Sequence, residues 1–505
     1  MPEILPQICA VITEETVDAA RAAMKQAATV ADLIELRLDY LKDFDYADQN
    51  ALASLLEQKP LPVIITCRSI AEGGRKHVDD GVRLRLLVEG ARGAADFCDI
   101  EAAYYSHASA LSPDISRLIV SYHNFEKTPE DLDAVYNRVT ALPAAVHKIV
   151  TRANTIIDAL AILRLLERAR AEEKQLIALA MGPAGMITRV LGPSRGSFLT
   201  YGSLASGKES ADAQLTCAEL IDLYRIRRLS RGTTITGIIG SPVAHSASPA
   251  MHNRAFAELG LAFVYFPFEV QDLAEFFDGF VRPATRNLGL NLRGFSVTIP
   301  HKSKVISLLD EVNESARMIG AVNTVVVDQG RLIGYNTDVQ GAMEPLEEVC
   351  DLAGQKCGVI GAGGAARAVI YGLLQRGARV EVFARNAQRA HSISESFGVP
   401  VSQLESLESS DVCVVINTTP VGMRGHSEGS SPVPTEALLR RQIVYDLVYN
   451  PLETRLLIEA RAAGCKTISG LEMLIAQAAL QFELWTGTKP PIEAMRRSAV
   501  SKISL

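Results

Sequence analysis

The chain has 505 residues, of which 48% are hydrophobic and 22% are charged, and its formal net charge is −7. This length is too great for a single hydrophobic core, so we expect two or three domains with the composition of an ordinary globular protein. The net negative charge disfavours nucleic acid and anionic lipid as partners, and no apolar run reaches the ~18 residues that would span a bilayer.

The N-terminus and the cysteines indicate the compartment. The stretch MPEILPQICAVIT enters an apolar strand without a basic signal-peptide region or an Arg/Ser-rich transit segment. The eight cysteines are scattered and form no CxxC pair, which favours reduced thiols over a structural metal site. We therefore expect a cytoplasmic protein that binds no metal.

Residues 1–222 alternate short apolar runs with helical patterns, which predicts parallel β/α units. The runs are QICAVIT, LIELRLD, PVIITCR, DFCDIE, RLIVSYH, VHKIVTR, LIALAMG and FLTYGS. Eight such units predict an α/β fold that begins with a (β/α)8 TIM barrel. The active site of that fold lies at the C-terminal ends of the strands.

Ionisable residues concentrate at these strand ends. They are Glu35, Arg37, Arg68, Glu101, His123 and Lys148. A buried lysine with a lowered pKa can attack a ketone as a neutral amine. His123 lies one β/α unit before Lys148, so its imidazole can remove a proton next to the resulting iminium, while arginines hold substrate. These residues predict a Schiff-base aldolase or dehydratase.

A basic, irregular stretch at 223–232 is predicted to be a linker, and a second α/β pattern follows it. Residues 356–386 contain a strand, a glycine turn, a helix and a second strand, which is the context of a dinucleotide-binding fold. The turn consists of Gly361, Ala362, Gly363, Gly364 and Ala365. Arg385, Asn386 and Arg389 follow the second strand without an acidic residue, which favours the 2′-phosphate of NADP over NAD.

Residues 1–222 resemble the type I 3-dehydroquinate dehydratases. The motifs are ELRLD with Glu35 and Arg37, TCRSIAEGG with Arg68 and Glu72, SYHNF with His123, VHKIV with Lys148, and MITRVLG with Arg189. The resemblance implies that Lys148 forms the imine, that His123 is general base and then acid, and that Glu72 orients it. It also implies a substrate-binding role for Glu35, Arg37, Arg68, Arg189, Ser210 and Gln214. The last two lie in SADAQ (210–214), where the family has Ser-Ala-Pro-Gly-Gln.

The second half resembles the shikimate dehydrogenases, with a substrate-binding domain at 233–335 and a Rossmann NADP-binding domain at 336–505 whose C-terminal helices return to the substrate lobe. The motifs are GSPVAHSASPAMHN, FSVTIPHK, GAVNT, GYNTD, NTTPVGM and GLEMLIAQAALQF. The resemblance implies that Lys302 and Asp338 are the catalytic pair. It further implies that Ser246, Ser248, Thr298, Asn323 and Gln477 bind substrate, and that Thr418, Gly470 and Met473 lie near the cofactor. The family's Asn-Arg-Thr phosphate clamp appears as Ala384-Arg385-Asn386.

Together the two resemblances predict a bifunctional enzyme of the shikimate pathway. It would dehydrate 3-dehydroquinate to 3-dehydroshikimate and reduce that product to shikimate with NADPH. Its partners are then small molecules, with neither nucleic acid nor membrane. Two alternatives are a dehydratase fused to an NAD-dependent quinate dehydrogenase, and a non-catalytic sensor of quinate or shikimate. A sensor would require lost catalytic groups and a DNA-binding segment.

Overall fold

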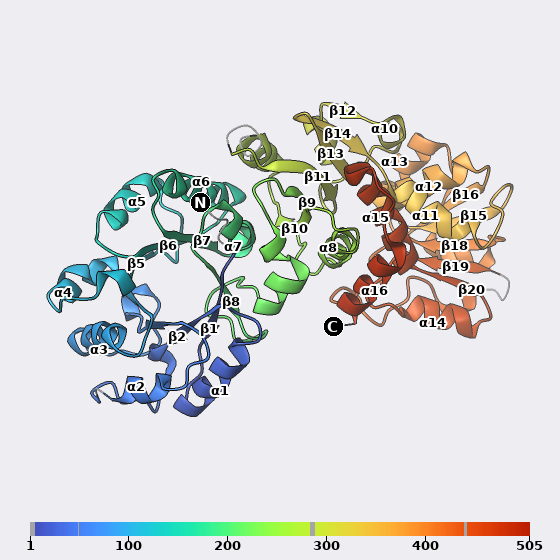
Figure 1. The fold of residues 1–505 in the computed structure, drawn as a ribbon. Helices are drawn as coiled ribbons and strands as arrows, with labels where there is room; N and C mark the ends of the chain where they lie inside the picture. Colours follow the sequence, from blue (N-terminus) through green and yellow to red (C-terminus); the bar gives the residue numbers. More distant parts are fainter. Residues whose placement is uncertain (1–5, 49, 283–287, 439–441, 505) are drawn as a thin grey trace. The chain divides into compact units, whose positions relative to one another are not determined.

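The computed structural model of the chain (Figure 1) describes residues 6–48, 50–282, 288–438 and 442–504, without the side chains of 387–389. The chain forms two compact units. One comprises Met1–Thr233 together with Glu275–Leu290, and the other comprises Thr234–Ala274 together with Asn291–Leu505. Each unit is described by itself below.

The first unit is a nearly closed barrel of eight parallel strands, as the apolar runs predict. The strand order is β7-β6-β5-β4-β3-β2-β1-β8, and a bridge between Leu176 and Ser197 links the start of β7 to the segment before β8. The strands are β1 (Ile8–Ile12), β2 (Leu33–Arg37), β3 (Val63–Thr66), β4 (Phe97–Glu101), β5 (Leu118–His123), β6 (Val146–Arg152), β7 (Leu176–Met181) and β8 (Thr200–Ser203). The helices are α1 (Val17–Ala27), α2 (Ala51–Leu56), α3 (Asp80–Arg92), α4 (Tyr105–Ser109), α5 (Leu132–Thr140), α6 (Ile156–Ala171) and α7 (Met186–Leu191).

The side chains inside the barrel form an apolar layer, and ionisable side chains form the layer next to it, toward the C-terminal ends of the strands. One buried cluster contains Val11, Leu33, Ile64, Ile119, Val146 and Ile177 from six different strands. Side chains two residues apart in a strand share a face, so Glu35, Ser121 and Lys148 lie on the same inner surface as Leu33, Ile119 and Val146. The strand ends therefore bring the polar residues together above an apolar layer.

The second unit contains two six-stranded sheets. The first has the order β10-β9-β11-β13-β14-β12, and the second is parallel with the order β17-β16-β15-β18-β19-β20. The first sheet and its helices are β9 (Thr234–Gly240), α8 (Ser248–Glu258), β10 (Phe263–Glu269), β11 (Asn291–Val297), β12 (Glu311–Val312), α10 (Glu314–Ile319), β13 (Thr324–Asp328) and β14 (Arg331–Tyr335). The C-terminal helices α15 (Gly470–Thr486) and α16 (Ile492–Ile503) pack against it, because α16 contacts α8 and α15 contacts β11 and β13.

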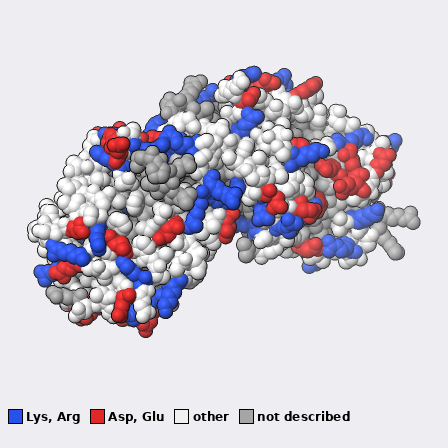
Figure 2. Space-filling view, in the orientation of Figure 1, with Lys and Arg blue, Asp and Glu red and all other residues white. Residues whose placement is uncertain are grey.

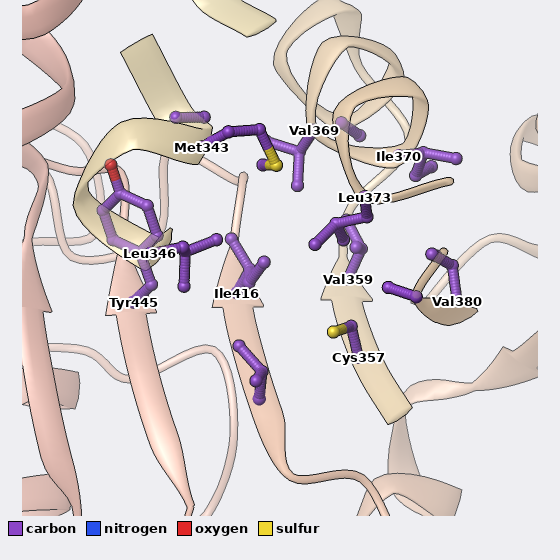
Figure 3. Close-up of a cluster of buried hydrophobic side chains, with 14 of the residues drawn as sticks. Met343, Leu346, Cys357, Val359, Val369, Ile370, Leu373, Val380, Ile416 and Tyr445 are labelled. Atoms are coloured by element: carbon purple, nitrogen blue, oxygen red, sulfur yellow. The ribbon is translucent and has the colours of Figure 1, made fainter. Parts of the chain in front are cut away.

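The second sheet confirms the predicted Rossmann fold. Its elements are α11 (Asp338–Glu347), β15 (Lys356–Ile360), α12 (Gly364–Gln375), β16 (Arg379–Ala384), α13 (Ala387–Phe397), β17 (Val401–Gln403), β18 (Val414–Asn417), β19 (Ile443–Asp446), α14 (Arg455–Ala462) and β20 (Lys466–Ser469). The strand order reverses between β15 and β18, and ligands of such sheets bind at that point. Figure 3 shows how α11 and α12 pack on these strands through Met343, Leu346, Val369, Ile370 and Leu373. This packing fixes the first turn of α12 beside the end of β15.

Acidic and basic side chains lie side by side in small groups on the face drawn in Figure 2. No described helix is both long and apolar enough to cross a bilayer. The described residues contain no cluster of three or more potential metal ligands, and the eight cysteines are free thiols.

Candidate active sites

Lys148 lies on β6 with its side chain inside the barrel, and only 4% of the residue is exposed. Its Nζ atom donates to Asp99 Oδ2 at 2.9 Å and to Glu35 Oε1 at 3.1 Å. The same atom lies 4.4 Å from the centre of the Tyr201 ring. Two carboxylates and an aromatic face therefore surround the amino group, which compensates the cost of burying its charge.

His123 ends the neighbouring strand β5, and its Nδ1 atom is 2.9 Å from Glu72 Oε2. Burial, together with the positive charges of Arg68 and Lys148, lowers the pKa of His123 well below its ordinary value. Burial also raises the pKa of Glu72 to about 7. The imidazole is therefore neutral at physiological pH and has the protonation state of a general base.

The tight turn after Glu72 holds its carboxylate next to His123. Gly73 has φ +84°, and a Cβ atom at this position would lie 2.6 Å from Phe125 Cζ. The Phe125 ring is stacked on the His123 ring at 6.1 Å and 17°. A Cβ atom at Gly74 would lie 2.1 Å from the carbonyl oxygen of Arg68. The two glycines of the EGG motif thus allow the turn to close beneath Phe125.

The three arginines predicted to bind substrate differ in their partners. Arg37 donates to both carboxylate oxygens of Asp39 at 2.9 and 2.8 Å, and Arg68 donates to Asp99 at 2.8 Å. Arg189 is 2% exposed, and its Nε and Nη2 atoms have no hydrogen-bond partner among the described residues. Burial lowers the pKa of Arg189 to about 10. A buried guanidinium with free donors is suited to an anionic substrate group.

In the second unit, Lys302 and Asp338 form an ion pair with an Nζ to Oδ2 distance of 2.5 Å. Asn323 donates through Nδ2 to Asp338 Oδ1 at 2.8 Å and to Thr337 Oγ1 at 2.9 Å. Lys302 follows β11, and Asp338 is the first residue of α11. The Asp338 carboxylate therefore bonds across the site instead of capping its own helix.

The other predicted substrate residues of this unit differ in their surroundings. Thr298 and Lys302 line the same cleft. Ser246 Oγ accepts a hydrogen bond from the backbone N–H of Ser248, the first residue of α8, at 3.2 Å. Gln477 donates to the carbonyl oxygen of Leu474 at 2.8 Å.

A cleft of 810 Å³ contains the glycine turn, and its lining includes Thr298, Lys302, Gly361, Ala362, Gly363, Gly364, Ala365, Arg385, Asn386 and Thr418. Gly361 has φ +114°, and a Cβ atom there would lie 2.7 Å from Thr418 Oγ1. A Cβ atom at Gly363 would have no neighbour within 4 Å, so the first turn of α12 is open to a ligand. Backbone N–H groups at the start of a helix favour an anion such as a pyrophosphate.

The strand-end prediction is consistent with this cleft. Arg385 is exposed and lines the cleft directly after β16. The side chain of Arg389 lies outside the described residues. Gly470 and Met473 are not among the residues that line the cleft, and Met473 packs in the core of the Rossmann sheet. A turn for a pyrophosphate and an arginine without an acidic neighbour fit NADP.

Known families match both units of the chain. Family models match residues 8–231 (type I 3-dehydroquinase), 238–325 (shikimate dehydrogenase substrate binding domain), 356–423 (NADP oxidoreductase coenzyme F420-dependent) and 470–499 (shikimate 5'-dehydrogenase C-terminal domain). The chain is 36% identical over 512 residues to the chloroplastic bifunctional 3-dehydroquinate dehydratase/shikimate dehydrogenase of Arabidopsis thaliana. That alignment covers 96% of this chain and 83% of the relative. The chain belongs to this bifunctional family.

Single-function proteins match the second unit of this bifunctional family member. The NADP(+) shikimate dehydrogenase of Pyrococcus abyssi is 44% identical over 271 residues, which is 53% of this chain and 98% of that protein. A crystal structure of a shikimate dehydrogenase in complex with NADP+ is 40% identical with a TM-score of 0.51, and covers 55% of this chain and 97% of that chain. The second unit therefore corresponds to a complete shikimate dehydrogenase.

Two contacts of Lys148, with Asp99 and with Tyr201, are not predicted by the motifs of the bifunctional family. A signal for Asp99 is present, because it lies two residues before Glu101 on β4 and so shares its inward face. Glu101 does not reach His123 but accepts from Arg83 Nη1 at 2.7 Å. His147 lies on the other face of β6 from Lys148, with Nε2 2.9 Å from the Leu142 carbonyl oxygen.

The loop SADAQ replaces the Pro-Gly pair of the dehydratase family by Asp212 and Ala213. Ala213 has φ +53°, a left-handed conformation that a glycine adopts more easily. Asp212 accepts a hydrogen bond from Arg152 Nη2 at 2.7 Å. The Oε1 atom of Gln214 accepts from the backbone N–H and the hydroxyl of Ser210 at 2.7 and 3.1 Å. The loop thus lacks the family's proline, but the Arg152–Asp212 ion pair and the bonds between Ser210 and Gln214 stabilise it.

Proposed function

We propose that the predicted site residues carry out the two reactions of the bifunctional family. The barrel dehydrates 3-dehydroquinate to 3-dehydroshikimate, and the second unit reduces 3-dehydroshikimate to shikimate. The cofactor of the second reaction is NADP, which supplies a hydride in its reduced form. The observation that carries the proposal is the buried Lys148 next to a neutral His123, in the same chain as the Lys302–Asp338 pair beside a nucleotide-binding cleft.

In the barrel, the amine of Lys148 gives up a proton and attacks the substrate ketone, and the carbonyl oxygen then leaves as water with that proton and one from the nitrogen, which gives an iminium. Asp99 and Glu35, which contact Nζ, are counter-ions for the positive charge on that nitrogen. The iminium withdraws electrons, so His123 can take a proton from the adjacent carbon. The resulting enamine expels the β-hydroxyl, which leaves as water with the proton that His123 returns.

Water then hydrolyses the iminium, which releases 3-dehydroshikimate and frees Lys148. Arg189 supports the choice of substrate, because its buried and unpartnered donors suit the ring carboxylate. Glu72 fixes the tautomer of His123 through Nδ1 and so leaves Nε2 for the transferred proton.

In the second unit, Lys302 stabilises the negative charge that develops on the carbonyl oxygen during reduction, and it supplies the proton there. Asp338 and Asn323 keep the ammonium in place. Ser246 and Ser248 bind the substrate carboxylate, and Arg385 binds the 2′-phosphate of NADP. The free thiols support a reducing compartment, which we propose to be the cytoplasm.

The proposal is tested by adding 3-dehydroquinate and NADPH and then trapping the imine. We expect nicotinamide absorbance to fall, with quinate and NAD giving slower turnover. Borohydride added with 3-dehydroquinate should leave a stable adduct on Lys148, which peptide mapping identifies. An adduct on another lysine, or an active protein without an adduct, would overturn the Schiff-base assignment.

A further inference from the structure

A chain of buried hydrogen bonds lies behind the Lys302–Asp338 pair. Tyr265 on β10 donates to Ser296 Oγ on β11 at 2.7 Å, and Ser296 donates to Gln481 Oε1 on α15 at 2.6 Å. Gln481 Nε2 donates to Thr324 Oγ1 on β13 at 3.0 Å, and Thr324 donates to Asn323 Oδ1 at 2.8 Å. Every member of this chain of bonds is at most 6% exposed. We call it the Gln481 relay.

Two backbone groups fix the direction of the bonds in the Gln481 relay. The N–H of Thr337 donates to Asn323 at 2.8 Å, so the atom that faces it must be the oxygen, and the NH2 group must face Asp338. Thr324 must then donate its single proton to Asn323.

The other amide is fixed in the same way. One end of the Gln481 amide lies 3.2 Å from the backbone carbonyl oxygen of Asn323 and also contacts Thr324 Oγ1. A backbone carbonyl oxygen can only accept a hydrogen bond. The NH2 group of Gln481 must therefore be on this side and its oxygen on the side of Ser296. The Ser296 hydroxyl then donates its single proton to Gln481 Oε1. Ser296 can therefore only accept from Tyr265, so the Tyr265 hydroxyl is the donor.

We propose that Gln481 is a positioning residue of the reductase, which fixes the amide of Asn323 so that its N–H group is presented to Asp338. The proposal rests on the proposed roles of Lys302 and Asp338. All bonds of the relay point the same way, and bonds in such a chain polarise and strengthen one another. The relay ends on the carboxylate that holds the Lys302 ammonium.

The far end of the relay lies near a second predicted substrate residue. The side chain of Ser248 is close enough to the Tyr265 hydroxyl to influence its pKa. The relay thus runs from the surroundings of Ser248 to the Lys302–Asp338 pair. We expect its loss to affect turnover more than affinity, because the Lys302–Asp338 geometry matters most as charge develops in the transition state.

Three substitutions interrupt the Gln481 relay at different distances from Asp338. Gln481→Leu removes the donor to Thr324 and should lower kcat for reduction of 3-dehydroshikimate on the order of 10- to 100-fold, with KM within about threefold. Ser296→Ala should lower kcat by a smaller factor than Gln481→Leu, and Tyr265→Phe should lower it by the smallest factor of the three. Gln481→Leu combined with Thr324→Val should lower kcat by less than the product of the two single effects, because both substitutions remove the bond between Gln481 and Thr324.

Two controls separate positioning from general destabilisation. Gln442→Leu alters another buried glutamine of the second unit, one that donates to Val412 O at 3.1 Å, and should keep kcat within about twofold. The dehydration rate of each variant measures active protein in the same sample, and the fluorescence of Trp485 reports folding around the relay.

The outcomes show whether the proposed role of Gln481 fails or whether the proposed function itself fails. Normal kcat in Gln481→Leu, alongside loss of turnover in Asp338→Asn, overturns the relay and leaves the proposed function intact. Normal turnover in Asp338→Asn overturns the proposed function itself. If Gln481→Leu does not fold, a kcat for Ser296→Ala no lower than that of Tyr265→Phe overturns the relay.

Discussion

At the residue scale, the dehydratase site depends on the proton shared between His123 and Glu72. Burial raises the pKa of Glu72 to about 7 and, with two nearby cations, lowers that of His123. Below pH 7 the Glu72 carboxyl is protonated and is only a weak acceptor for the Nδ1–H of His123. Above pH 7 the carboxylate accepts a stronger hydrogen bond from that N–H and makes Nε2 a stronger base.

We therefore predict that kcat for dehydration rises as the pH increases through about 7. Glu72→Gln should remove this rise, because the amide accepts a hydrogen bond from His123 but does not titrate. At pH 8 its rate should be lower on the order of 10-fold, and the difference should shrink at pH 6. The measurement is kcat from pH 5.5 to 9, with the reductase rate of the same sample as a control. A rise centred near pH 7 in Glu72→Gln would contradict the assignment.

Single residues also show the limit of sequence-based prediction. His123 and Lys148 could be predicted because strand ends of a barrel converge on one rim, whereas Glu72 could be predicted only through the resemblance of TCRSIAEGG to the dehydratase family. The bonds of Gln481 could not, since Ser296 and Asn323 are 185 and 158 residues away in the sequence. Nothing local to the helical stretch LEMLIAQAALQF distinguishes Gln481 from a glutamine on a solvated face.

At the element scale, α8 carries His252 into an aromatic core. The residue is fully buried, and neither ring nitrogen has a hydrogen-bond partner among the residues described. Its ring lies 4.5 Å from that of Tyr265 and 5.3 Å from that of Trp485. Burial alone lowers the pKa of His252 to about 3. The unfolded chain has an ordinary histidine with a pKa near ~6.5.

This difference predicts an acid-sensitive second unit. Below pH ~6.5 the histidine binds a proton in the unfolded state but stays neutral in the folded state. The free energy of unfolding therefore falls by ~1.4 kcal/mol per pH unit, which amounts to a loss of about 2 kcal/mol at pH 5. The loss continues until the folded pKa of about 3 is reached. His252→Phe should remove this dependence. Denaturant unfolding followed by the fluorescence of Trp485, the single tryptophan, measures it.

The matched control for this prediction is His391→Gln, because His391 is an exposed histidine on α13 of the same unit. We expect that variant to keep the pH dependence of the wild-type protein. An unchanged slope between pH 6.5 and 5 in His252→Phe would show that other groups cause the acid sensitivity.

Elements with a regular apolar period were the predictable part of the fold. The eight apolar runs of the barrel coincide with β1 to β8, because a strand buried on both faces reads as a continuous apolar stretch. The segment Glu275–Val281 could not be placed in the same way, since it lies between two strands of the second unit but groups with the barrel. Its local pattern contains no information about that long-range packing.

At the scale of the whole molecule, each predicted catalytic site is built from one unit. The barrel residues lie between Glu35 and Gln214, and the reductase residues lie between Ser246 and Gln477, so the two sets fall in different compact units. A substitution in one site should therefore leave the chemistry of the other unchanged.

This separation predicts complementation between two inactive variants. Lys148→Ala should abolish dehydration and keep normal reduction, whereas Lys302→Met should keep dehydration and lower reduction on the order of 10²- to 10⁴-fold. Neither variant alone should oxidise NADPH at a substantial rate with 3-dehydroquinate. An equimolar mixture should do so at about half the wild-type rate, after a lag in which 3-dehydroshikimate accumulates in solution. If the mixture stays inactive although each variant retains its other activity, the intermediate does not reach the second unit through solution, and the two reactions are coupled within one molecule.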